Sequence, residues 1–211
     1  MSENEAKQEQ ESYYDEYQNF SFHPKNILLI LLLISLTGLF LSLSAAFVYS
    51  RVQNNQPPVR LPNIFLFNTL ILLGSSATMI WAKRSYRADH TLNYQRALVA
   101  TMLLSVVFMI LQYIGWQTLF RQDIFIHSSN SASYLYVISG LHFAHVIGGL
   151  PFLGVFLWRA RYEMKEPVTV LVYFSDPEKR LRLRLLTIYW HFLDGLWIYL
   201  VLFFWINYLI R

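Results

Sequence analysis

The sequence predicts an all-α protein, a polytopic transmembrane bundle of five helices. Hydrophobic residues make up 55% of its 211 residues and charged residues only 14%. The charges gather in blocks between long apolar runs, unlike the interspersed charges of a soluble surface. Five runs reach the length of about 20 helical residues that a hydrocarbon core about 30 Å thick requires. Because these runs are continuously apolar, without the alternation of barrel strands, helices are expected.

The five expected spans lie approximately at residues 26–49, 64–82, 97–120, 133–158 and 185–210. Residues 1–25 are rich in Glu, Gln, Asn and Tyr and are expected to form a flexible polar cytoplasmic tail. The acidic N-terminus and the length of the first apolar run indicate that no cleavable signal sequence is present. Residues 26–211 therefore form one five-helix transmembrane domain.

Prolines mark the connections and one helix interior. Three prolines between the first two spans favour an extended connection. Pro151 lies inside the fourth span and is expected to bend it, because proline cannot donate a backbone hydrogen bond. In the longest connection, residues 159–184, Asp176 and Pro177 predict a turn followed by a basic helix start. Anionic lipid headgroups are enough to neutralise this interfacial segment.

Stripes of small residues predict where helices pack closely. Such residues recur every four positions in the first span (Gly38, Ser42, Ala46) and in the fourth (Gly140, Ala144, Gly148). Small side chains let helix backbones approach each other within a membrane.

The basic residues predict a cytoplasmic N-terminus and a C-terminus on the periplasmic or outer side. Thirteen of the seventeen Lys and Arg residues fall in the N-terminal tail and in the second and fourth connections. The other side of the membrane then holds Arg51, Arg60, Arg121 and Arg211. This asymmetry follows the positive-inside rule, so the basic composition reports topology and no nucleic-acid partner is expected.

The first candidate site is a pair of polar residues in the fifth span, His191 and Asp194. A charged Asp at the centre of a spanning helix costs about 2.5–3.5 kcal/mol on insertion scales, so Asp194 is expected to point into the protein. Residues three apart share a helix face, which lets the pair bond to each other or to the same partner helix.

Other candidate intramembrane groups are His142 and His145 in the fourth span and Gln112 in the third. Together with His191 and Asp194 they could ligate a metal, relay protons or form interhelical hydrogen bonds. Interhelical hydrogen bonding is the preferred interpretation, at about 0.6–2 kcal/mol per contact. Trp190 and Trp197 are interpreted as packing residues.

The ligand set does not favour a metal. Zero cysteines exclude thiolate sites and iron–sulfur clusters. No Glu lies in any span, although di-metal bundle sites need several. His142 and His145 on one helix cannot be trans ligands of one haem, whereas an axial pair of His142 with His191 stays open. No catalytic residue is assigned.

Four segments resemble, in order, the subunit III family of the haem-copper respiratory oxidases. The resemblance spans residue 27 to the C-terminus, and its last two motifs are specific in combination. The segments are Asn68-Thr69-Leu70 through Ser75-Ser76 to Trp81-Ala82; Leu111-Gln112-Tyr113-Ile114-Gly115-Trp116; Gly140-Leu141-His142-Phe143-Ala144-His145-Val146-Ile147-Gly148-Gly149; and Tyr189-Trp190-His191-Phe192-Leu193-Asp194 with Trp197.

The resemblance implies a non-redox accessory subunit of a proton-pumping cytochrome c oxidase that reduces oxygen to water. Such a subunit binds no cofactor and is not catalytic by itself; haems and copper belong to subunits I and II, its partners. Structural phospholipids, support of assembly, oxygen access, proton uptake and catalytic durability are also implied. The five-helix length is similar to the shorter bacterial form, which implies the bacterial cytoplasmic (inner) membrane.

Two departures from the family pattern bear on the function. A buried Glu frequent near the positions of Leu36 to Gly38 is missing, and the Glu frequent beside the tryptophan of the second motif is Gly115. A proton-antenna role tied to the first carboxylate is therefore not carried over. A quinol oxidase subunit or an accessory protein of nitric oxide reductase would have a similar sequence. An autonomous membrane haem protein or proton-coupled transporter is the alternative of another class.

Overall fold

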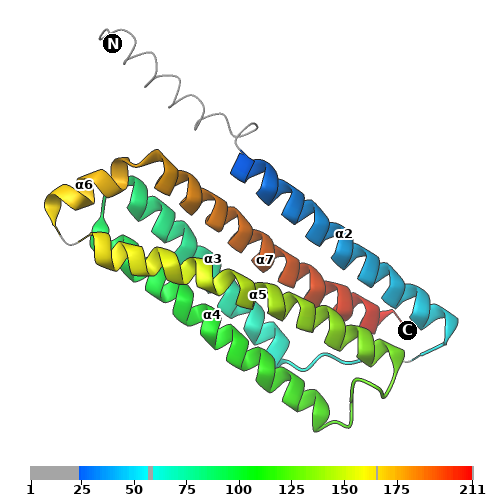
Figure 1. The fold of residues 1–211 in the computed structure, drawn as a ribbon. Helices are drawn as coiled ribbons and strands as arrows, with labels where there is room; N and C mark the ends of the chain where they lie inside the picture. The colour runs from blue at the N-terminus through cyan, green and yellow to red at the C-terminus, as the bar shows by residue number, and fades with distance from the viewer. Residues whose placement is uncertain (1–23, 57–58, 165, 211) are drawn as a thin grey trace.

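The computed structural model describes residues 24–56, 59–164 and 166–210, and over these ranges the chain forms six α-helices and no strand. Five of the helices are long and apolar enough to cross a membrane. Figure 1 shows these five packed side by side along most of their length. The predicted all-α bundle with five spans is confirmed. The expected tail falls almost entirely on residues 1–23, outside the described residues.

Each long helix extends beyond its predicted span. The five are α2 (Pro24–Gln53), α3 (Ile64–Arg87), α4 (Thr91–Phe120), α5 (Asn130–Glu163) and α7 (Pro177–Leu209). The apolar run defines only the part of a helix that lies in hydrocarbon, whereas the helix itself continues into polar flanks until a capping or turn residue ends it. The helix α5 runs through Pro151 without interruption.

A sixth, short helix, α6 (Pro167–Ser175), lies in the connection between α5 and α7, before the predicted turn and helix start, and it was not predicted from the sequence. A capping box between Glu166 and Thr169 starts it. The predicted turn follows directly: Asp176 ends α6 and caps α7, its side chain accepting from the backbone N–H groups of Glu178 at 2.9 Å and Lys179 at 3.4 Å. Figure 1 shows α6 at one end of the bundle, between the end of α5 and the start of α7.

Two clusters of buried side chains hold the bundle together. One runs along α2, α3, α4, α5 and α7 and includes Phe40, Phe108 and Trp197, all fully buried or nearly so. The other lies at the end of the bundle where α3 and α5 finish and α7 begins, called here the basic end, and includes Tyr94 and Tyr173. The helix α3 packs along α4 and α7, and α5 packs against α2, α4 and α7.

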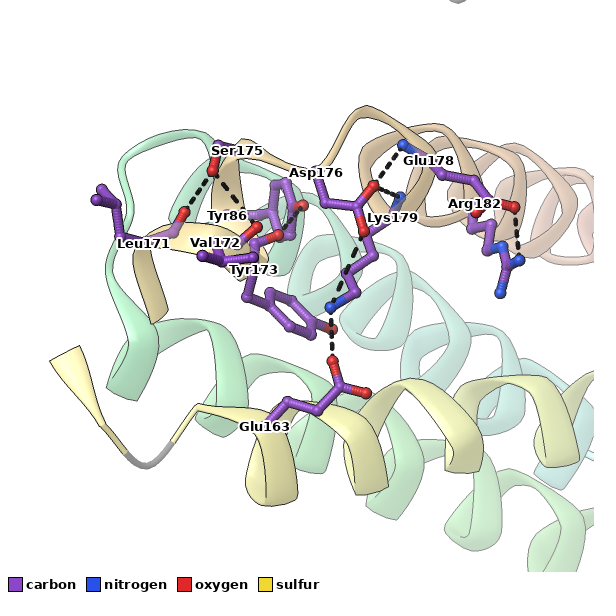
Figure 2. A network of polar contacts seen from close by, with 10 residues as sticks. All are labelled: Tyr86, Glu163, Leu171, Val172, Tyr173, Ser175, Asp176, Glu178, Lys179 and Arg182. Carbon is purple, nitrogen blue, oxygen red and sulfur yellow. Dashed lines mark hydrogen bonds and ion pairs between the residues drawn. The ribbon is translucent and has the colours of Figure 1, made fainter. Parts of the chain in front are cut away.

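Polar contacts hold α6 and the start of α7 against the ends of α3 and α5, as Figure 2 shows. The Tyr86 hydroxyl donates to the Tyr173 carbonyl oxygen at 3.0 Å. The ammonium group of Lys179 lies 2.6 Å from Glu163 and 4.2 Å from the centre of the Tyr173 ring. Burial raises the pKa of the Tyr173 phenol, so this ring stays neutral beneath the ammonium group.

The three glycines of the small-residue stripes do not mark close helix contacts inside the bundle, so the prediction was wrong at these positions. A Cβ added at Gly38, Gly140 or Gly148 meets nothing within 4 Å. The close approach occurs at Gly149, where a Cβ would lie 3.0 Å from the Tyr189 ring and 3.1 Å from the Trp190 ring. A period of four residues identifies a helix face, but it does not say whether that face looks into the chain or out of it.

The adjacent glycines give a direct test of this packing. Gly149→Leu is expected to destabilise the protein by about 1–3 kcal/mol, because the new side chain must displace two aromatic rings. Gly148→Leu meets open space and serves as the matched control, with little change expected. Thermal unfolding of the full chain in detergent measures both, and equal losses would contradict the packing described here.

Candidate functional site

Trp197 lies where four helices meet. Its indole is 1% exposed and stacks on Phe65 of α3 at 5.8 Å between ring centres. It packs edge-on against Phe108 of α4 at 5.1 Å and lies 5.0 Å from the His142 ring of α5. Trp197 therefore links α7 to three other helices, as expected of a packing residue.

His142 is fully buried and joins α5 to α7. Its Nε2 lies 3.1 Å from the carbonyl oxygen of Leu193. Because a carbonyl oxygen only accepts, this contact assigns the proton to Nε2. Nδ1 has no hydrogen-bond partner within the described part of the chain.

Asp194 and His191 meet one residue of α3, the serine at position 76. The Ser76 hydroxyl lies 2.7 Å from His191 Nδ1 and is close enough to the Asp194 carboxyl group to act on it, although Asp194 Oδ2 has no hydrogen-bond partner within the described residues. Asp194 is 4% exposed and His191 is half-buried. Of the two arrangements that the sequence left open, the structure shows the one in which both residues turn to the same partner helix.

The neighbouring serine makes a parallel contact. The Trp190 indole N–H donates to the Ser75 hydroxyl oxygen at 3.0 Å, and both residues are buried. Ser75 and Ser76 thus face three side chains from one turn of α7, namely Trp190, His191 and Asp194. The serine pair is part of the first of the four family motifs, but the sequence did not identify it as a candidate site. Its only local signal was two adjacent hydroxyls in an apolar run.

A second polar contact joins α3 to α4. The Asn68 amide nitrogen donates to the Gln112 side-chain oxygen at 3.1 Å, and each residue is only 1% exposed. Asn68 lies one turn from Phe65, and Gln112 lies one turn from Phe108, so the contact borders the rings around Trp197. Gln112 is therefore placed beside the same four-helix junction as His142.

His145 lies apart from this junction, on the side of α5 that faces α2. Its Nδ1 is 2.7 Å from the Leu141 carbonyl oxygen of its own helix, and its ring packs edge-on against Phe40. The Tyr189 hydroxyl donates to the His145 backbone oxygen at 3.0 Å. The sequence grouped His142 with His145, whereas the structure gives them different partners.

These contacts serve to hold helices together. Apart from His145, these polar side chains contact a neighbouring helix, and such contacts are favourable in a membrane, where the alternative is a polar group in hydrocarbon. Over residues 24–56, 59–164 and 166–210, no group of three or more His, Cys, Asp or Glu residues is placed to hold a metal ion. In the axial pair of His142 with His191 that the sequence left open, His142 Nε2 faces the Leu193 carbonyl instead of His191.

The shared Ser76 contact predicts how Asp194 variants behave. Asp194→Asn keeps a hydrogen-bonding group against Ser76, so we expect a loss below about 1 kcal/mol. Asp194→Leu leaves the serine without this partner and should cost about 1–3 kcal/mol. Thermal unfolding and membrane yield of the full chain measure the difference. If both variants lose the same stability, the contact is not what holds α7 to α3.

Comparison with known proteins gives a consistent family. The family model described as cytochrome c oxidase subunit III matches residues 9–208. Similar curated proteins named cytochrome c oxidase subunit 3 include one from Yarrowia lipolytica, 29% identical over 192 residues, which are 85% of this chain and 67% of that protein. Another, from Synechocystis, is 27% identical over 81% of this chain and 70% of its own length.

A third relative, from Pelomedusa subrufa, is 32% identical over 65% of this chain. The chain spans 48% of the length of that relative and 62% of one from Emericella nidulans, so these proteins are longer than the chain described here. The match nevertheless runs through all five membrane-crossing helices and the polar contacts between them. The chain therefore belongs to the cytochrome c oxidase subunit III family, which confirms the resemblance drawn from its four motifs.

Proposed function

We propose that this chain is a non-redox accessory subunit III of a proton-pumping cytochrome c oxidase, the complex that reduces oxygen to water in aerobic respiration. The family match over residues 9–208 carries the proposal. The internal geometry supports it, because His142, His191 and Asp194 are all engaged in contacts between α3, α5 and α7. Such a bundle is built to keep its shape beside a catalytic partner.

Subunit I is proposed as the main partner, with subunit II and the other chains of the complex around it. In this arrangement the haems and copper lie in the partners, and the chain supports assembly, binds phospholipids and contributes to oxygen access and catalytic durability. The proposed location is the bacterial cytoplasmic membrane. The surface available for these contacts is large: only 17% of the most apolar stretch of α2 is buried within the chain.

A spectrum with and without partners tests the proposal. Protein tagged at the N-terminus and gently solubilised should carry haem together with large partner chains, identified by mass spectrometry. Stripping to the single chain should remove the haem. A Soret band retained by the isolated chain would contradict the proposal, and a partner lacking the copper site for cytochrome c would indicate a quinol oxidase.

Within the assembled complex, His142→Ala and His145→Ala are expected to leave the haem spectrum unchanged. The reason is that His142 Nε2 faces a backbone carbonyl and His145 Nδ1 its own helix. The reduced-minus-oxidised difference spectrum, normalised to the amount of partner subunit, is the measurement. A lost Soret component in either variant would identify a haem ligand in this chain.

The proposed orientation is testable because the chain contains no cysteine. We expect a His127→Cys variant, in the exposed connection between α4 and α5, to react with an impermeant maleimide in spheroplasts. A His90→Cys variant, in the exposed connection between α3 and α4, should react only after permeabilisation. The reverse pattern would show that the basic end faces outward and that the positive-inside assignment fails.

A further inference from the structure

A pocket opens at the basic end of the bundle, between the end of α3, the end of α6 and the start of α7. Its volume is about 570 Å³. Four cationic side chains line it, namely Lys83, Arg87, Arg180 and Arg184, and Tyr86 and Ser175 add hydroxyl groups. Lys83 and Arg87 lie one helical turn apart on α3, and Arg180 and Arg184 lie one turn apart on α7. Two helices therefore present cations to the same space.

Three carboxylates of this end, Glu163, Asp176 and Glu178, are engaged with other cations. Glu178 pairs with Lys25 and Arg182, and Lys179 bridges Glu163 and Asp176, as Figure 2 shows in part. Within the described residues, none of the salt bridges involves Lys83, Arg87 or Arg180.

The pocket cations also act on one another. The positive charges of Arg87 and Arg184 are close enough to Lys83 to repel its ammonium group. Like charges gathered in one pocket repel, and an anion placed between them relieves that repulsion. Arginine is suited to this role because its planar guanidinium matches a phosphate group with two parallel N–H bonds. The pocket chemistry therefore points to a phosphate.

Apolar side chains lie beside the cations of the pocket. They favour a lipid as the ligand over a soluble phosphate. On α6, Val168, Leu171 and Val172 form one outward face and are 72%, 72% and 61% exposed. Phe174 and Leu181 line the pocket itself. A short helix with an apolar outer face is typical of segments that lie in the headgroup region of a membrane. A ligand with an anionic head and apolar chains fits both surfaces.

We propose that this pocket binds the phosphate headgroup of an anionic phospholipid, with its acyl chains along the apolar face of α6. The proposal deepens the lipid binding included in the proposed function, and it assigns that binding to particular residues. It relies on the proposed orientation only in placing the basic end at the cytoplasmic leaflet, where anionic headgroups attract basic residues.

The binding experiment uses the full chain, purified with its partner subunits in phosphatidylcholine nanodiscs. Native mass spectrometry counts the phosphatidylglycerol molecules retained by the chain as the mole fraction of this lipid is raised. A saturable site for phosphatidylglycerol over phosphatidylcholine is the expected result. Glycerol 3-phosphate in solution is the second arm: if it occupies the pocket as tightly and displaces the lipid, the ligand is a soluble phosphate and the lipid proposal fails.

Matched double variants separate a pocket from diffuse surface charge. A charge-assisted hydrogen bond from a guanidinium to a phosphate contributes about tenfold to binding, so Arg87→Gln with Arg180→Gln should weaken retention about 100-fold. Arg159→Gln with Arg161→Gln removes the same charge from the end of α5, outside the pocket lining, and should change retention less than about fivefold. Equal losses in the two pairs would overturn the pocket. Arg87→Lys with Arg180→Lys keeps both charges but loses the paired N–H bonds, so it should restore part of the retention, which shows that the glutamine pair had not simply misfolded.

Failure of this inference is distinguishable from failure of the proposed function. The same preparations report which partner chains co-purify and whether haem is present. Loss of lipid selectivity in an intact haem-containing complex counts against the pocket alone. A complete phosphatidylglycerol site on a chain that never co-purifies with an oxidase counts against the proposed function and leaves the pocket standing.

Discussion

The contacts between the serine pair of α3 and one face of α7 determine how this bundle closes. A membrane supplies no hydrophobic force between helices, because lipid chains are as apolar as the side chains, so specific polar and packing contacts must select the neighbours. The short connection between α3 and α4 makes them neighbours along the chain, whereas α7 is far from α3 in sequence. Ser75 and Ser76, with Trp190, His191 and Asp194, supply that long-range link.

The packing around the link depends on it. With α7 placed against α3, Trp197 stacks on Phe65 and meets Phe108 and His142, and these rings fill the space between four helices. A lateral shift of α7 would separate these rings and would also move Leu193 away from His142 Nε2. The aromatic packing and the polar contacts therefore favour the same register, which is what gives a bundle one structure.

Much of the fold could be predicted because the bilayer restricts what a chain can do. Five apolar runs of sufficient length had to be helices, and only their ends were wrong, since hydropathy falls at the headgroups while the helix continues. The helix α6 was missed because its nine residues are too few to establish a helical period and because four of them are β-branched, which disfavours a helix. A turn and a capped helix start at Asp176 and Pro177 were predictable from local chemistry.

The candidate site shows where a single sequence stops being informative. Periodicity placed His191 and Asp194 on one face, and the insertion free energy of a carboxylate indicated that this face looks inward. Neither quantity names the helix on the other side, so Ser76 was not foreseen. The pairing of Asn68 with Gln112 likewise depends on how α3 and α4 are rotated, which side-chain packing decides.

The outward surfaces of α2 and α5 have the features of surfaces that contact other helices. Gly38 and Gly148 open onto the outside of the bundle, and α2 buries a smaller share of its most apolar stretch than α7 does, 17% against 39%. Small residues facing lipid gain nothing from close backbone approach, but against another helix they permit it. A surface of this kind is consistent with partner helices covering α2 and α5, whereas the inward polar contacts already hold the chain in its own shape. Under the proposed function, this division allows the intramembrane histidines and carboxylate to be structural while the chain acts through the partners it packs against.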